Sequence, residues 1–365
     1  MFNRRLLKNF DYPLLLITLT LCCYGLIVLS SATQGLSSDP LFFVRKQAIW
    51  IGMGVVAILL AISIDYIKFY RWSWYFYALN LLLLGLVIFF GRDMGGASWL
   101  DLIFFDFQPS ELAKLIVIIT LARLLADYRE RVNRFWSAWP FFLHIIPVIL
   151  LIMLQPDLGT ALVFVIIFFA MLYMAGIPVG HLAIVVTAGI AAFPLFWLKL
   201  MDYQKMRLLV FLNPGMDPLG YGYQLRQSMI AIGSGGISGK GLFEGTQARL
   251  QFLPEQHTDF IFSVLGEELG MLGAIVLLML YLCLIYRILK IGAFAKDCFS
   301  ALVCTGVASM ITFQILVNVG MAIGIMPVTG LPLPFMSYGG SSMLTNMLAI
   351  GVILNMGMRR QKIQF

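Results

Sequence analysis

Long apolar runs constrain this chain more than any other feature. Ten of them are long and uncharged enough to be membrane-crossing helices, at residues 13–32, 41–63, 73–90, 109–126, 138–154, 158–175, 180–199, 258–289, 298–325 and 338–358. Such a helix needs about 20 residues. Only 12% of the 365 residues are charged and 61% are hydrophobic, whereas roughly 25% are charged in a soluble domain. The sequence predicts an all-α integral membrane protein, a single polytopic domain over 1–365.

Basic residues indicate how this bundle is oriented. With a cytoplasmic N-terminus, the short inner segments hold most of the lysines and arginines, as the positive-inside rule requires. They are Arg4, Arg5, Lys8, Lys68, Arg71, Arg123, Arg129, Arg131, Arg134, Arg287, Lys290, Lys296, Arg359, Arg360 and Lys362. An even number of spans places both termini in the cytoplasm. One large extracytoplasmic loop, about 200–257, then lies between spans seven and eight.

Two classes of function find no support in the sequence. No basic run is interleaved with aromatic residues, so we expect no nucleic-acid partner. The cysteines lie in apolar helices or at helix ends without C-x-x-C spacing, and three lone histidines make no zinc pattern. These cysteines therefore read as small apolar side chains rather than a disulfide or metal set.

The stretch 252–262 turns abruptly from a polar loop into membrane-type sequence. Thr258 is the expected N-cap of span eight, which would put Asp259 in the first helical turn, where an acid interacts well with the helix dipole. A helix-start charge is therefore one interpretation of Asp259. However, Glu267 and Glu268 follow in the same helix, and acids in a membrane helix are costly unless they face water, protein or substrate.

Two further outer motifs carry charge. Glu111 and Lys114 open span four after Pro109 and share one helix face at i,i+3 spacing. Asp157 lies in the turn 155–160 between spans five and six. A structural ion pair and a capped turn explain these motifs as well as a binding site does.

The two remaining outer loops are rich in glycine and proline. The long loop contains an expected short interfacial helix at 229–232, then a Ser-Gly-Gly sequence at Ser234, a weak phosphate-cradle signal. The loop 330–342 predicts non-helical backbone at membrane depth, which is tolerated only inside protein or along a cavity. We expect one outer cavity to gather five charged residues, namely Glu111, Lys114, Asp157, Lys240 and Asp259.

These stretches together resemble the SEDS family of bacterial membrane proteins (shape, elongation, division and sporulation). The resemblance follows the family's order over nearly the whole chain. Its motifs are Gln108-Pro109-Ser110-Glu111 with Lys114, Gln155-Pro156-Asp157-Leu158-Gly159-Thr160, Ala231-Ile232-Gly233-Ser234-Gly235-Gly236, Leu253-Pro254-Glu255 with His257-Thr258-Asp259-Phe260, and Pro332-Leu333-Pro334 through Ser337-Tyr338-Gly339-Gly340. The segment 245–247 and the short termini resemble the family's elongation members more than its division members.

The resemblance implies a peptidoglycan glycosyltransferase that polymerises lipid II at the outer face of the bacterial cytoplasmic membrane. It implies Asp259 as the catalytic residue. The expected substrate-binding residues are Lys114, Glu111, Asp157, Lys46, Lys240, Ser234, Glu255, His257 and Thr258. The implied partners are a class B penicillin-binding protein and, for elongation members, MreC and MreD.

This sequence departs from the family pattern at two positions. Lys46-Gln47 stands where many members have Arg-Gln, and Ser98 precedes Trp99 where many have Arg. Lysine keeps the charge but lacks the planar fork that suits phosphate, which weakens a pyrophosphate role for Lys46.

The chemistry that the resemblance implies suits these residue types. Asp259 would act as general base for the acceptor hydroxyl, and Lys114, Lys46 or a divalent cation would stabilise the leaving pyrophosphate. No tightly bound cofactor is expected, because the sequence has no adjacent carboxylate pair suited to a metal; any Mg²⁺ or Mn²⁺ would come with the substrate. A lipid II flippase and a non-catalytic scaffold for the penicillin-binding protein are the rival hypotheses.

Overall fold

The computed structural model describes residues 9–34, 36, 39, 41–93, 98–102, 105–128 and 139–359. Arg4, Arg5, Lys8, Arg129, Arg131, Arg134, Arg360 and Lys362 of the orientation argument lie outside these ranges. The elements, in chain order, are α2 (Tyr12–Ala32), α3 (Phe42–Ser63), α4 (Tyr66–Phe90), β1 (Arg92–Asp93), β2 (Ser98–Leu102), β3 (Phe105–Phe107), α5 (Pro109–Asp127), α6 (Trp139–Leu154), α7 (Leu158–Met174), α8 (Val179–Lys199), α9 (Asp202–Leu212), η3 (Pro214–Met216), α10 (Tyr221–Gly235), α11 (Thr246–Arg249), α12 (Ile261–Ala293), α13 (Cys298–Ala322) and α14 (Gly340–Met358).

Each of the ten predicted spans coincides with one of these helices. Among the described residues, seven helices are long and apolar enough to cross a membrane: α2, α3, α4, α8, α12, α13 and α14. The helices α6 and α7 are apolar but shorter. The remaining helix, α5, carries Glu111, Lys114, Arg123 and Asp127. The structure is thus a multi-pass helical bundle.

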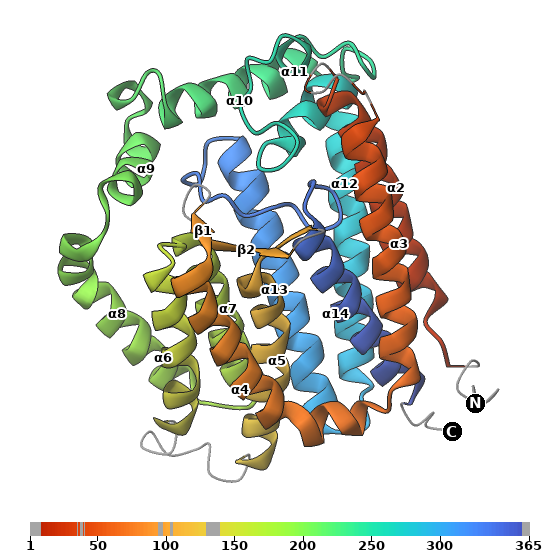
Figure 1. Ribbon diagram of the computed structural model, residues 1–365, viewed down its shortest axis with the longest axis vertical. Helices are drawn as coiled ribbons and strands as arrows, with labels where there is room; N and C mark the ends of the chain where they lie inside the picture. Colours follow the sequence, from red (N-terminus) through yellow and green to blue (C-terminus); the bar gives the residue numbers. More distant parts are fainter. Residues whose placement is uncertain are drawn as a thin grey trace.

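The bundle is built around its last two helices. In their most apolar windows, 89% of α14 and 67% of α13 are buried, whereas no residue of α8 is. Figure 1 shows α13 and α14 among α2–α7 and α12, with α10 and α11 across one end. The start of α2 and the end of α14 lie together at the opposite end. The helices α8 and α9 run along one side, where α8 is free to meet lipid.

A short three-stranded sheet departs from the all-α prediction. The strands form an antiparallel meander in the order β1-β2-β3, with Leu100 opposite Phe107. A spanning β-barrel needs strands of about ten residues, and a search for such strands misses segments of two to five residues. The sheet lies between α4 and α5, just before the Glu111 motif.

The start of α12 also differs from the prediction. The helix begins at Ile261 with Phe260 as its N-cap, so Thr258 is not the cap and Asp259 lies before the first turn. The cause is a tight turn, in which the carbonyl of Glu255 accepts hydrogen bonds from the N–H groups of residues 258, 259 and 260 at 3.1–3.2 Å. Glu255 itself adopts φ 49°.

The same helix is broken in its third turn. Gly270 has φ 63° and ψ −160°, a conformation essentially restricted to glycine. The residues after it bond to the α10–α11 connection, since Met271 N–H donates to Gly236 O at 3.0 Å and Leu272 N–H to Ile237 O at 3.1 Å. The predicted continuous span is therefore a two-turn segment followed by a longer helix.

Candidate active site

The turn that carries Asp259 is bonded to a re-entrant loop between α13 and α14. Ser337 Oγ donates to Thr258 O at 2.6 Å, and Tyr338 N–H donates to His257 O at 2.9 Å. In α13, Asn318 Nδ2 donates to Asp259 O at 2.9 Å and to Leu331 O at 2.8 Å. Residues 327–339 form no helix, which confirms the prediction over 330–339, whereas residues 340–342 already belong to α14. Leu331, Leu333, Phe335 and Met336 of this loop are buried. The loop therefore holds the Asp259 backbone in place.

The carboxylate of Asp259 faces Gly330, where the wall of the site has no side chain. A Cβ at Gly330 would lie 3.6 Å from Asp259 Oδ2. Burial, together with the negative charge of Glu255, raises the pKa of Asp259 to about 6, and Arg207 opposes this shift. A carboxyl group with a pKa near 6 is suited to proton transfer near neutral pH.

Arg207 was missed by the sequence analysis. It lies on α9, within the long segment that was expected to be mostly loop, and no residue of the recognised motifs points to it. Its guanidinium lies over the rings of Tyr203 and Tyr221, 5.6 and 5.0 Å from their centroids. Arg207 also donates to Thr329 O at 3.4 Å, while its buried Nε has no partner among the described residues. The site thus contains a preorganised cation near Asp259.

The predicted pair on α5 is present and buried. Lys114 Nζ lies 2.7 Å from Glu111 Oε1, and the two side chains are 1% and 4% exposed. Asp157 caps α7 by accepting a hydrogen bond from Thr160 N–H at 2.9 Å. Burial raises the pKa of Asp157. The hydrogen bonds from Thr160 and the positive charge of Lys114 oppose this shift, whereas the negative charge of Glu111 adds to it. These three charged groups therefore lie close enough to interact.

Two contacts join the group of Glu111, Lys114 and Asp157 to the region of Asp259. Tyr203 Oη and Gln204 Nε2, both on α9, donate to Pro156 O at 2.5 and 3.1 Å, next to Asp157. A Cβ at Gly159 would lie 2.8 Å from Thr329 O, the atom that accepts from Arg207. The Asp157 turn, α9 and the loop residues 329–330 therefore meet around one site. We call Asp259, Arg207, Asp157, Lys114 and Glu111 the acid–base cluster.

The other residues of the Asp259 motif surround this cluster. The side chain of Glu255 is exposed, and its Oε2 accepts from Thr258 Oγ1 at 3.3 Å. The ring of His257 packs between Phe43 and Tyr338, at 5.1 and 5.8 Å between centroids, and burial lowers its pKa. His257 therefore supports the turn as a neutral packing group.

Lys46 occupies the outer edge of this region. It is exposed, with Nζ 4.4 Å from the ring centroid of Phe42. Its buried neighbour Gln47 bonds the re-entrant loop, donating to Ser337 O at 3.1 Å and accepting from Gly339 N–H at 3.3 Å. The second residue of the Lys46-Gln47 motif thus stabilises the loop next to Asp259.

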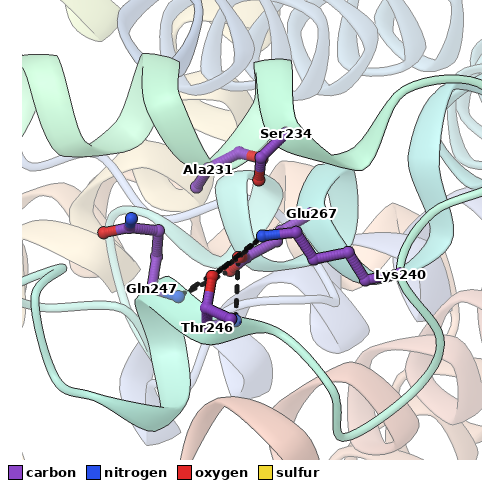
Figure 2. A network of polar contacts seen from close by, with 6 residues as sticks. All are labelled: Ala231, Ser234, Lys240, Thr246, Gln247 and Glu267. Carbon is purple, nitrogen blue, oxygen red and sulfur yellow. Dashed lines mark hydrogen bonds and ion pairs between the residues drawn. The ribbon is translucent and has the colours of Figure 1, made fainter.

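Lys240 lies in a separate network, shown in Figure 2. Its Nζ lies 2.6 Å from Glu267 Oε1, and Glu267 also accepts hydrogen bonds from the backbone and hydroxyl of Thr246 and from Gln247 N–H. Glu267 is 0% exposed, and its carboxylate accepts the first N–H groups of α11, so it faces protein. These bonds join α12 to the α10–α11 connection.

Ser234 lies on α10 beside that network (Figure 2), where its hydroxyl donates to Ala231 O at 2.8 Å. Ser234 and Gly235 end α10 and Gly236 is its C-cap, so two of the three amides of the Ser-Gly-Gly sequence lie within a helix. Glu268, on the other side of α12, accepts a hydrogen bond from Ser31 of α2. Glu268 therefore packs against another helix.

The described side chains provide no ready-made metal centre. Within those ranges, no group of three or more His, Cys, Asp or Glu residues is arranged to hold an ion. The negative charge of Glu255 raises the pKa of Asp259, and the positive charge of Arg207 opposes this shift.

Three comparisons connect this chain to known proteins. The family model for FtsW, RodA and SpoVE, described as "Cell cycle protein", matches residues 12–362. Stage V sporulation protein E of Bacillus subtilis is 38% identical over 94% of this chain and 96% of its own length. Peptidoglycan glycosyltransferase MrdB of Escherichia coli K12 is 38% identical over 97% and 95%.

Solved structures agree with these relatives. A chain from the structure called "Structural coordination of polymerization and crosslinking by a peptidoglycan synthase complex" superposes with a TM-score of 0.84 at 33% identity, covering 97% of this chain and 99% of the other. Rod shape determining protein RodA of Thermus thermophilus superposes with a TM-score of 0.73 at 32% identity, covering 96% of this chain and 97% of the other. This chain therefore belongs to the FtsW/RodA/SpoVE family, the SEDS family that its sequence motifs resemble.

Proposed function

We propose that this protein is a peptidoglycan glycosyltransferase that polymerises lipid II. The observation that carries the proposal is the acid–base cluster, in which the Asp259 carboxyl group has a pKa of about 6 and lies near the Arg207 guanidinium. Relatives that match over almost their whole length carry the name peptidoglycan glycosyltransferase. Their likeness supports the same activity here.

In the proposed reaction, Asp259 is the general base. Its carboxylate takes the proton of an acceptor sugar hydroxyl while that oxygen bonds to the anomeric carbon of a second lipid II molecule. The bond from that carbon to the lipid pyrophosphate breaks, and the leaving group keeps the electron pair. Positive charge placed where this negative charge develops lowers the barrier.

Two cations of the cluster are available to the pyrophosphate. Arg207 has an unpartnered buried Nε and a planar fork that suits phosphate oxygens. Lys114 is held by Glu111 at the other side of the cluster. We assign Arg207 the main contact and leave Lys46 and Lys240 outside the reaction, with any Mg²⁺ or Mn²⁺ bound to the substrate.

The proposal includes a location and an orientation. Ten spans with both termini in the cytoplasm, in the bacterial cytoplasmic membrane, would put α9–α11 and the cluster on the outer face. The common end of α2 and α14 supports an even number of spans. The cluster would then meet lipid II after that lipid has reached the outer leaflet.

We further propose that the protein acts in cell elongation with a class B penicillin-binding protein, and with MreC and MreD. Likeness to RodA of Thermus thermophilus and to a chain of a peptidoglycan synthase complex supports this assignment. Relatives from sporulation and division match similarly well, at 38% and 36% identity. The elongation role therefore rests on the 245–247 segment.

The test uses purified protein, alone and with its penicillin-binding partner, given labelled lipid II in detergent. We expect glycan polymer that is insensitive to moenomycin and absent for Asp259→Asn. Normal polymerisation by Asp259→Asn would refute the assigned base. If no polymer forms even with the partner, lipid II transport in vesicles would identify a flippase, and its absence a scaffold.

A further inference from the structure

One buried amide in α13 has no hydrogen-bond partner among the described residues. Gln314 is 0% exposed, and neither its Oε1 nor its Nε2 has a hydrogen-bond partner among the described residues. Asn318, one turn later and also 0% exposed, has an unpartnered Oδ1. Unsatisfied polar atoms at membrane depth cost several kcal/mol each. Three such atoms within one helical turn indicate a polar binding site rather than packing.

The orientation of Asn318 shows where its free oxygen points. Its Nδ2 donates both hydrogens, to the carbonyls of Asp259 and Leu331. These two bonds fix the amide, so Oδ1 faces away from both carbonyls. Gln314 lies four residues earlier, about 6 Å down the helix and 40° around it. Gln314 and the Oδ1 atom of Asn318 therefore lie on neighbouring parts of one helix face.

The register between α13 and α5 places Gln314 at the level of the first turn of α5, which carries Glu111. The end of α5 and the start of α13 both contact the start of α4, through the bonds from Arg123 to Tyr70 O and from Tyr66 to Asp297. The two helices are thus antiparallel. A Cβ at Gly306 would lie 2.7 Å from Ile118.

Gln314 lies eight residues after Gly306 on α13, and Ser110 lies eight residues before Ile118 on α5. In antiparallel helices this register places Gln314 beside Ser110, next to Glu111. The Lys114 ammonium has three hydrogens, of which Glu111 accepts one at 2.7 Å. Acceptors for the others are needed in a region where little solvent reaches. Gln314, which this register places beside the first turn of α5, carries an amide oxygen that can accept such a bond.

We propose that Gln314 is a positioning residue that, through buried water, links the Lys114–Glu111 pair to Asn318 and so to Asp259. One water molecule typically makes about three hydrogen bonds to buried polar groups. Here it would accept from Gln314 Nε2 or Lys114 Nζ and donate to Asn318 Oδ1. The link holds the two halves of the acid–base cluster in register, and it rests on the proposed role of Asp259.

The first test is Gln314→Leu, which replaces the amide with an apolar side chain of similar size. We expect the kcat for glycan polymerisation to fall 10- to 100-fold, the loss that follows from a displacement of about 1 Å. The KM for lipid II should stay within about twofold, and the thermal midpoint should not fall, because an amide without protein partners is removed. The matched control is Asn80→Leu, a buried amide of α4 whose Nδ2 is also unpartnered; it should leave kcat unchanged.

A second measurement detects the water without using activity. Radiolytic labelling modifies side chains next to bound water, and Met310, four residues before Gln314, is fully buried. We expect Met310 to be labelled in the wild type, and labelling to fall in Gln314→Leu to the level of Met171, a buried methionine beside Gly306.

Unchanged kcat in Gln314→Leu while Asp259→Asn is inactive would overturn the proposal. So would a lower kcat accompanied by a lower thermal midpoint or a raised KM, or equal labelling of Met310 in both proteins. If Asp259→Asn polymerises normally, the assigned base fails instead, and the labelling still reports on the water.

Discussion

At the scale of single residues, the pKa of Asp259 makes the proposed chemistry measurable. A general base must be deprotonated, so activity should be present above a pH of about 6 and lost as the pH falls through that value. At pH 5, one unit below the pKa, we expect about one tenth of the plateau rate. Initial rates of polymerisation in buffers of constant ionic strength would give this profile.

Two neighbours should shift that profile in opposite directions. The negative charge of Glu255 raises the pKa of Asp259, so Glu255→Gln should move the loss of activity to lower pH. The positive charge of Arg207 lowers it, so the residual activity of Arg207→Gln should be lost at higher pH. A profile that moves the same way in both variants would show that another group controls the rate.

Arg207 should also affect the rate at the optimal pH. Arg207→Lys keeps the charge but loses the planar group that lies between Tyr203 and Tyr221. We expect kcat/KM to fall about 100-fold, as when one stabilising donor is removed from a transition state. The matched control is Arg226→Gln, an arginine of α10 bonded only to carbonyls of its own segment among the described residues, which should retain activity.

The sequence predicted charged pairs whose members are close along the chain. The i,i+3 spacing of Glu111 and Lys114 is confirmed by a 2.7 Å contact, and Asp157 lies close enough to interact with them. Arg207 could not be found this way, because its neighbours come from residues 203, 221 and 329, and only the tertiary fold brings them together. A cation without a motif gives no local signal.

At the scale of elements, the Glu267 network should decide how firmly α12 holds the α10–α11 connection. Glu267→Ala removes the carboxylate that pairs with Lys240 and accepts the first N–H groups of α11. We therefore expect the free energy of unfolding to fall by about 3 kcal/mol or more. A thermal melt in detergent measures this. Asp202→Asn breaks an exposed pair with Lys205 at 3.9 Å and should cost less than about 1 kcal/mol; an equal loss in both would show that Glu267 contributes little.

The break in α12 makes a sharper prediction at Gly270. A Cβ there would lie 2.3 Å from Gly239 N and 2.7 Å from Ile237 O, at a backbone conformation that alanine avoids. Gly270→Ala should therefore lower the yield of folded protein. In α4, a Cβ at Gly85 meets nothing within 4 Å, so Gly85→Ala should be neutral or stabilising by about 0.5–1 kcal/mol. Similar yields from both variants would contradict the assigned strain.

Hydropathy predicted where helices exist better than how they begin and bend. Each of the ten ranges contains a helix, because the length of an apolar run is enough to predict one. The break at Gly270 was not predicted, because a glycine inside an apolar run does not interrupt the hydropathy. The N-cap at Phe260 was not predicted either. The turn around Glu255 that displaces the helix start requires a positive φ, which a glutamate in the sequence does not indicate.

At the scale of the whole molecule, the proposed topology places α9–α11 and the acid–base cluster outside the cell. A cysteine at Ser238, exposed in the α10–α11 connection, should react in intact spheroplasts with a thiol reagent that cannot cross the membrane. A cysteine at Lys296, exposed between α12 and α13, should react only after the membrane is opened. The unsubstituted chain gives the background of the five native cysteines, of which Cys22 and Cys304 are buried. Because one continuous helix segment after Gly270 separates the two positions, the same reactivity at both would mean that this segment does not cross the membrane, and the orientation of the cluster would then have to be reassigned.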